Sequence, residues 1–193
     1  MAQLIIQPND TDCYFKSNAP TENYDSSYWL AIGVVLGPGI ERGLLKFDFS
    51  PLPNRDSINL ISAVLEAYVL GSTDEGRTLK ACRLTRSNWT KDGATWNTYD
   101  GSNNWSSSGG DYTTTDEASA TTADLETISF DVLNQVEYAI INTSNILHIL
   151  MKDNSEAEEH YTNISSSREE TESLRPKLTL TYEYINGFWF GNG

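Results

Sequence analysis

Residues 89–112 read WTKDGATWNTYDGSNNWSSSGGDY, and this stretch sets the organisation of the whole chain. It holds three of the five tryptophans, two tyrosines and four glycines, with Asn, Ser, Thr and Asp between them. Neither the period of a helix nor that of a strand runs through this mixture. We therefore expect a long, shaped loop, held by its aromatic side chains, between two halves of a β-protein.

Short apolar segments separated by turn residues lie on both sides of this stretch. The clearest alternation is LLKFDF at residues 44–49, where positions 45, 47 and 49 face one way and Lys46 and Asp48 the other. A continuous apolar run, YWLAIGVVL at residues 28–36, is typical of a buried strand. Further strands are expected at residues 3–7, 13–15, 58–70, 78–84, 127–130, 146–151, 164–167 and 178–182.

Two other segments complete the expected fold. Residues 112–124 are rich in Thr, Ala and Ser and predict an exposed loop with edge-strand character at most. After Asp131, apolar residues at helical spacing predict one amphipathic helix of about three turns; they are Val132, Leu133, Val136, Ile140 and Ile141. The pattern predicts an all-β fold, an antiparallel jelly-roll-like β-sandwich with one short helix. We expect a single domain over residues 1–185 and an aromatic C-terminal tail at residues 186–193.

The overall charge restricts the kinds of partner. With 27 acidic and 13 basic residues, the formal net charge is −14 at pH 7. Binding to a nucleic-acid backbone or to an anionic membrane surface needs clustered Lys and Arg, so we expect neither partner. The length of 193 residues and the hydrophobic content of 38% suffice for one sizeable domain with its own core.

The cysteines and the N-terminal sequence bear on the compartment. Cys13 and Cys82 are the two cysteines, and two free thiols are the favoured interpretation over a disulfide between them. The start, MAQLIIQPND, lacks the basic n-region and the long apolar run of a signal peptide. No window approaches the roughly 18 apolar residues of a transmembrane helix.

The candidate catalytic and metal-binding residues lack a supporting pattern. Neither His148, expected on the solvent face of its strand, nor His160 has a Ser or Cys nucleophile placed in a known motif. Several carboxylates could hold a hard cation such as a structural Ca²⁺, but their spacing matches no calcium loop. These are Asp10, Asp12, Asp92, Asp100, Asp111, Glu156, Glu158 and Glu159. We predict no cofactor and no enzymatic activity, and metal binding stays undecided.

Aromatic side chains are the remaining candidates for function, because Trp and Tyr combine an apolar face with a polar group. Trp105 and Tyr112 stand among Asn, Ser and Gly, so we expect them to be exposed and to contact a ligand or partner. Trp89 and Trp96 are expected to close one end of the sandwich.

The C-terminal tail offers a second group of aromatic residues. Phe188, Trp189 and Phe190 are consecutive, so they cannot all face one core. Either they fold back on their own sandwich or they contact a neighbouring protein, and the sequence leaves both options open.

Several motifs occur together, in one order, over nearly the whole chain. They are GLLKFDFSPLP at 43–53, Ile58 with SAVL at 62–65, WTKDGATWN at 89–97, SRE at 167–169 and RPKL at 175–178, with weaker matches at Asp12, Asn23-Tyr24 and Ile32-Gly33. This set resembles DNRLRE-type domains, also described as disaggregatase-related repeats, which include a carbohydrate-binding module family. Lys91 stands where that family usually has an acidic residue.

The resemblance implies a jelly-roll-like β-sandwich that is usually not an enzyme. Members occur as modules of bacterial and archaeal surface proteins and of polysaccharide lyases, and as phage virion proteins. The resemblance also implies that Trp89 and Trp96 belong to the architecture. Arg168 and Arg175 are scarce cations in an acidic chain, and we expect each to fix a loop to the sandwich by a charge-assisted hydrogen bond.

Two functions follow as alternatives. The favoured one is a structural or assembly protein, such as a phage capsid decoration (cement) protein or a tail or fibre component, with protein partners in a homo-oligomer or virion. The alternative is a carbohydrate-binding module or cell-surface adhesion domain with a polysaccharide partner. The expected location is a virion or an extracellular surface.

Overall fold

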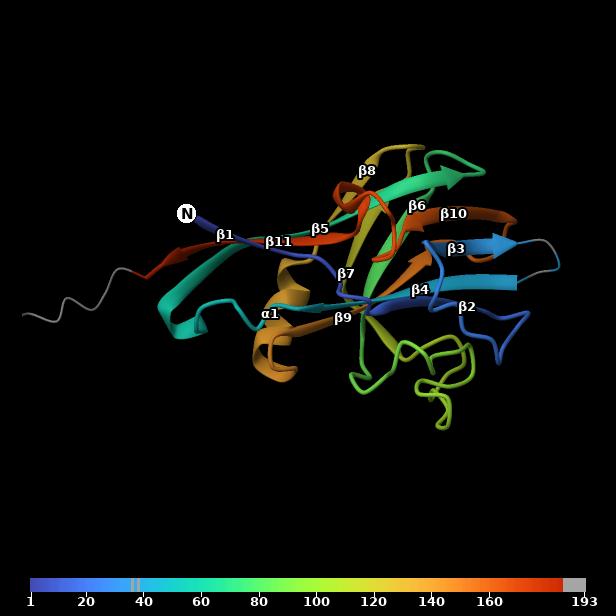
Figure 1. The fold of residues 1–193 in the computed structure, drawn as a ribbon, viewed down its shortest axis with the longest axis horizontal. Coiled ribbons are helices and arrows are strands. Elements are labelled where there is room, and N and C mark those ends of the chain that lie inside the picture. The colour runs from blue at the N-terminus through green and yellow to red at the C-terminus, as the bar shows by residue number, and fades with distance from the viewer. Residues whose placement is uncertain (36, 38, 186–193) are drawn as a thin grey trace, which may run out of the picture.

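The structure, a computed structural model, describes residues 1–35, 37 and 39–185 and consists mainly of β-strands (Figure 1). The strands are β1 (Ala2–Ile6), β2 (Asp12–Lys16), β3 (Trp29–Val35), β4 (Gly39–Asp48), β5 (Ile58–Ser72), β6 (Thr78–Leu84), β7 (Tyr112–Thr121), β8 (Thr127–Asp131), β9 (Ile146–Asp153), β10 (His160–Ser165) and β11 (Lys177–Tyr184). The described residues also form one α-helix, α1 (Leu133–Asn142), and two 3-10 helices, η1 (Arg55–Ser57) and η2 (Glu172–Leu174).

Antiparallel pairing joins the strands in the order β1-β11-β5-β10-β3-β4-β9-β6-β7, with β2 also paired to β4 and β8 to β5. The sheet curls back on itself, so that strands far apart in this order enclose one core (Figure 1). The 15-residue β5 links the two halves, because its first part pairs with β11 and β8 and its last part with β10. This arrangement confirms the predicted all-β, jelly-roll-like sandwich with one short helix.

Alternation along β4 shows how the interior is filled. Leu45 and Phe47 are fully buried in the main core, whereas Leu44 points to the opposite face of the sheet. Other strands and α1 add to the main core the side chains of Leu30, Ile32, Leu65, Val69, Val136, Ile149 and Leu180. Leu44 is nevertheless fully buried, because residues 85–111 cover its face of the sheet. We call this segment, which joins β6 to β7, the Trp-rich loop; Figure 1 shows it in green beneath β2 and β4.

Two local predictions differ from the structure. The segment from residue 112, expected as a loop with edge character at most, forms the full strand β7 at the end of the sheet order. Its small and polar side chains suit such an edge position. The helix begins where expected, and the Asp131 carboxylate accepts the N–H of Leu133 at 3.2 Å. Ile141, however, is 62% exposed, so the apolar stripe of the helix is narrower than its spacing predicts.

Gly33 occupies a backbone conformation that other residues avoid. Its φ is +130°, and a Cβ atom there would lie 2.4 Å from the carbonyl oxygen of His160 on β10. We expect Gly33→Ala to lower the free energy of unfolding by about 2–4 kcal/mol, measured by urea denaturation. Gly71→Ala is the matched control, because a Cβ there meets nothing within 4 Å. Equal denaturation midpoints for the two variants would contradict this account of Gly33.

Candidate functional site

The Trp-rich loop builds a second hydrophobic core on the outer face of β2, β4 and β9. Its Trp89, Ala94 and Trp105 side chains are at most 5% exposed. They pack on residues that the strands turn away from the main core, namely Cys13, Phe15, Leu44, Leu84 and Leu150. Trp89 therefore closes a face of the sheet and not, as expected, the end of the sandwich. Because this face is covered, β2 and β9 are buried on both sides.

The expected exposure of Trp105 is wrong. Its ring centroid lies 5.8 Å from that of Tyr99 and 6.3 Å from that of Phe15, and its indole N–H donates to the carbonyl oxygen of Thr95 at 2.8 Å. The neighbouring Asn and Ser residues are exposed, while the indole itself turns inward and is 5% exposed. Trp105 therefore has no free ring face for a ligand.

Trp89 anchors the Trp-rich loop through a buried hydrogen bond to β9. Its indole N–H donates to Nδ1 of His148 at 3.0 Å. His148 lies on the outer face of its strand, but it is 5% exposed because the loop covers it, so its expected contact with solvent is wrong. Burial, assisted by the positive charge of Lys46, lowers the pKa of His148 to about 4. The neutral imidazole accepts the hydrogen bond from Trp89, which a protonated ring cannot do.

This hydrogen bond predicts a loss of stability in mild acid. The folded-state pKa of His148 lies below the unfolded value of 6.5, so only the unfolded chain takes up the proton as the pH falls below 6.5. The contribution of His148 is fully present above pH 6.5 and is lost progressively down to about pH 4, by up to about 3 kcal/mol.

Urea unfolding at neutral pH and near the folded-state pKa of about 4 measures this effect. Many carboxylates titrate in the same range, so the quantity to compare is the difference between the wild type and His148→Gln, which accepts a hydrogen bond without titrating. We expect the variant to lose less stability on acidification. Parallel losses in the two proteins would show that protonation of His148 does not weaken the fold.

Trp96 and Tyr112 are half-buried and face Arg42 of β4. The guanidinium carbon of Arg42 lies 5.0 Å from the Trp96 ring centroid and 5.4 Å from that of Tyr112. Glu156 holds the same guanidinium through two hydrogen bonds of 2.8 and 2.7 Å, and the Gly109 carbonyl accepts a third at 2.7 Å. Arg42 therefore occupies a face of each ring. Trp96, like Trp89, covers the sheet rather than the end of the sandwich.

The expected contact role of Tyr112 stays a prediction with a narrower basis. Tyr112 lines an open groove of about 610 Å³ together with Arg86, Asp111 and several Ser and Thr residues. Asp111 is fixed there by the N–H groups of Ser106 and Ser107 and by Arg86. Burial opposes ionisation of Asp111, but these donors outweigh it and hold the pKa of the carboxyl below its usual range.

Other proposed cation ligands also have partners within the protein. The Asp10 carboxylate binds Lys91 at 2.6 Å and Arg168, and Asp100 accepts two backbone N–H groups of its own turn. Within the part of the chain that the structure describes, no group of three or more His, Cys, Asp or Glu side chains is placed to hold a metal ion. The two cysteines are buried free thiols, which confirms the favoured interpretation.

The arginines of the SRE and RPKL motifs fix the loop that precedes β11. Arg168 contacts the buried Asp12 carboxylate at 3.5 Å, and the same carboxylate accepts the N–H of Ser167 at 2.6 Å. Nε of Arg175 donates to the Glu169 carbonyl at 2.7 Å. Burial raises the pKa of Asp12, while Ser167 and Arg168 act in the opposite direction. Both arginines thus hold loops in place, and neither contributes a free binding group at these atoms.

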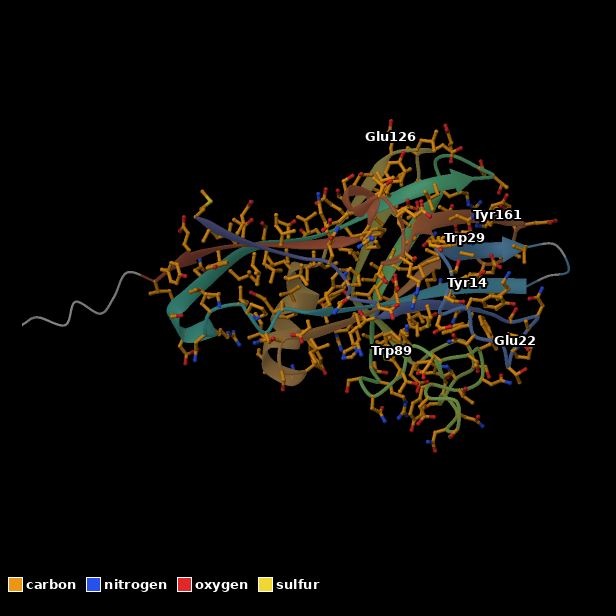
Figure 2. The ribbon with its side chains drawn as sticks, viewed as in Figure 1. Tyr14, Glu22, Trp29, Trp89, Glu126 and Tyr161 are labelled. Atoms are coloured by element: carbon orange, nitrogen blue, oxygen red, sulfur yellow. The ribbon has the colours of Figure 1, made fainter. Side chains whose placement is uncertain are left out.

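Exposed aromatic side chains gather instead on β3 and β10. Trp29 is 43% exposed and Tyr161 is 39% exposed. The antiparallel register places Trp29 opposite Ser165 and Tyr161 opposite Gly33, so both aromatic side chains lie on one face of the sheet. In Figure 2 the labels of Tyr161 and Trp29 lie next to each other at β10 and β3, and Tyr14 of β2 lies beyond β4.

A stacked pair of tyrosines borders Trp29. The ring centroids of Tyr14 and Tyr24 lie 4.6 Å apart with 17° between the planes. The Lys16 ammonium lies 4.9 Å from the Tyr24 centroid and binds Glu41 at 2.7 Å. Burial raises the pKa of Tyr14, and the charge of Lys16 and a hydrogen bond with the Trp29 side chain oppose this rise. Tyr14 is 5% exposed and belongs to the main core, so we call Tyr24, Trp29 and Tyr161 the aromatic face.

Comparison with known protein families identifies the family of this chain. The model of carbohydrate-binding module family 96 matches residues 6–182, nearly the whole chain. The chain belongs to carbohydrate-binding module family 96. A search among curated proteins finds no match to it.

Membership in family 96 favours one of the two functions that the sequence left open. It supports carbohydrate binding by a non-catalytic module and lends no support to a phage virion component, which stays a prediction. The predicted partner residues Phe188, Trp189 and Phe190 lie outside the described residues. In the described part of the family 96 module, no helix is long and apolar enough to cross a membrane.

Trp29, the most exposed tryptophan among the described residues of the family 96 module, is not among the residues that the sequence predicts to contact a ligand. It lies in residues 28–36, which were expected to form one continuous buried run. A finer pattern is present within the run: Trp, Ala and Gly at 29, 31 and 33 alternate with Leu, Ile and Val at 30, 32 and 34. Residues 30–34 are all buried in β3, so burial does not separate the two sets; the pairing with β10 places Trp29 on the same face as Tyr161.

Proposed function

We propose that this family 96 module binds polysaccharide and that its aromatic face is the binding surface. The observation that carries the proposal is the exposure of Trp29 and Tyr161 on one face of paired strands. A single exposed apolar residue needs no explanation, but several aromatic rings on one face mark an interaction surface.

The chemistry of the aromatic face suits a sugar. One side of a sugar ring carries mainly C–H groups and can lie flat on an indole or phenol ring, while its hydroxyl groups bond to polar neighbours. Trp29 and Tyr161 offer the rings, and the partly exposed Lys16, which the buried Glu41 holds at 2.7 Å, places a positive charge at the border. Because strand backbones hold these side chains, little conformational freedom is lost on binding.

The competing surface, the Trp-rich loop, offers fewer free rings. Trp89 and Trp105 are buried, and Arg42 occupies a face of Trp96 and of Tyr112. The aromatic face is therefore the better candidate.

Electrophoresis in gels that contain single polysaccharides tests the proposal. Neutral glucans, xylans and mannans and polymers of uronic acids would each be cast into a native gel. We expect at least one polymer to retard the wild type and Trp29→Ala to migrate as in a plain gel.

Tyr184→Ala is the matched control, because Tyr184 is 58% exposed and lies at the end of β11, away from β3 and β10 (Figure 1). This variant should be retarded like the wild type. Retardation of Trp29→Ala to the wild-type extent would rule out the aromatic face as the binding surface.

A further inference from the structure

The two exposed rings of the aromatic face are too far apart for one sugar. Trp29 pairs with Ser165, and Tyr161 lies four residues earlier on β10. At a rise of about 3.3 Å per residue, the two positions are about 13 Å apart along the strands. A single sugar ring stacked on Trp29 therefore leaves Tyr161 unoccupied.

Most residues between the two rings have small side chains. Ala31 and Gly33 lie on this face of β3, and Asn163 lies on the same face of β10. On the next strand Gly71 pairs with Asn163, and a Cβ atom at Gly71 would meet nothing within 4 Å. Between the rings, in the region we call the strip, Ala31 is 4% exposed and Gly33 is buried, and the half-buried Asn163 amide offers a hydrogen-bonding group.

Both ends of this strip are exposed. Beyond Trp29, the preceding residue Tyr28 is 53% exposed. Beside Tyr161, the exposed Thr73 donates its N–H to the Tyr161 carbonyl at 3.0 Å and ends the pairing on that side. Because Tyr28 and Thr73 are exposed, a sugar chain can continue past either ring.

We infer that the aromatic face binds the interior of an extended polysaccharide chain. The chain lies along β3 and β10, with one sugar on Trp29, another on Tyr161 and at least one sugar over the strip between them. The inference rests on the proposed function and adds the form of the ligand: a polymer segment, in preference to a single sugar or a chain end.

Titration with oligosaccharides of increasing length tests this inference. The probes are homologous series from disaccharide to octasaccharide, prepared from a β-glucan, a xylan, a mannan and a uronic-acid polymer. We expect affinity in the series that binds to rise by about tenfold or more from the disaccharide to the longest members. Chemical reduction of the terminal sugar should leave the affinity of the longest members unchanged.

Tyr161→Ala provides the matched variant. It removes the second ring and should reduce the gain with length while leaving the binding of short members at Trp29 unchanged. Thermal unfolding of the variant checks that the sandwich stays folded, as expected for an exposed position.

The outcomes separate the inference from the function on which it rests. Equal affinity for disaccharide and octasaccharide, or binding that depends on an unmodified chain end, would overturn the inference while leaving polysaccharide binding intact. Absence of binding by every oligosaccharide series and every parent polymer would overturn both.

Discussion

Trp89→Ala is expected to lower the free energy of unfolding by about 3–5 kcal/mol. Trp89 is 2% exposed, so the substitution opens a large cavity in the second core between the Trp-rich loop and the sheet. It also leaves the buried Nδ1 of His148 without its donor at 3.0 Å. Both losses act only in the folded state, so they add to the destabilisation. Urea unfolding followed by tryptophan fluorescence and circular dichroism measures the change.

The exposed Trp29 gives the matched control for the same chemical change. We expect Trp29→Ala to alter the free energy of unfolding by less than about 1 kcal/mol, because its ring is 43% exposed and leaves no closed cavity. If Trp89→Ala were no more destabilising than Trp29→Ala, the Trp-rich loop would not be an integral part of the fold.

Trp29→Ala is expected to weaken polysaccharide binding by about 2 kcal/mol or more, which is about 30-fold in affinity. The indole presents the largest exposed ring of the aromatic face, and its neighbours Tyr14 and Tyr24 are fixed by their mutual stacking. Tyr161, the other exposed ring, lies about 13 Å away along the strands and cannot replace Trp29 under the same sugar. Isothermal titration calorimetry with the polymer that retards the wild type measures the loss.

Two further variants test whether the loss of affinity in Trp29→Ala comes from the lost ring stacking. Trp29→Tyr keeps an aromatic ring and should recover part of the affinity, which a loss of folding would not allow. Tyr184→Ala should bind like the wild type. Equal weakening by Trp29→Tyr and Trp29→Ala would mean that ring stacking is not the interaction at this position.

The arrangement of strands was largely predictable from the sequence, because strand period and turn residues are local signals. LLKFDF at residues 44–49 alternates between the main core and the outer face as expected, and the segments at 78–84 and 178–182 form β6 and most of β11. Strand β7 was missed, since a row of Thr, Ala and Ser carries little hydrophobic signal and its pairing with β6 is a long-range contact.

The candidate site was predicted at the wrong tryptophan, for a physical reason. Trp105 stands among exposed polar residues and Trp29 in an apolar run, so local composition points to the first and hides the second. What decides their exposure is the fold: the loop turns Trp105 inward onto Phe15, and the pairing with β10 places Trp29 on the same face as Tyr161. The inward turn of Trp105 leaves no trace in the residues next to it in the chain.

The same limit explains His148 and Arg42. The alternation of β9 correctly places His148 on the outer face, but only the packing of the Trp-rich loop shows that this face is covered. Arg42 reaches Gly109 and Glu156, both distant in sequence, and these contacts decide that the ring faces of Trp96 and Tyr112 are occupied. Side-chain contacts of this kind follow from the assembled sandwich alone.

The indole N–H signals of the tryptophans in a proton–nitrogen correlation spectrum test the central claim most directly. Single Trp→Phe substitutions assign each signal, and the spectrum is then recorded with and without the oligosaccharide that binds most tightly. We expect the Trp29 signal to shift on binding and the signals of the buried Trp89 and Trp105 to stay in place. A shift of the Trp105 signal with an unchanged Trp29 signal would contradict the account and place the binding surface on the Trp-rich loop.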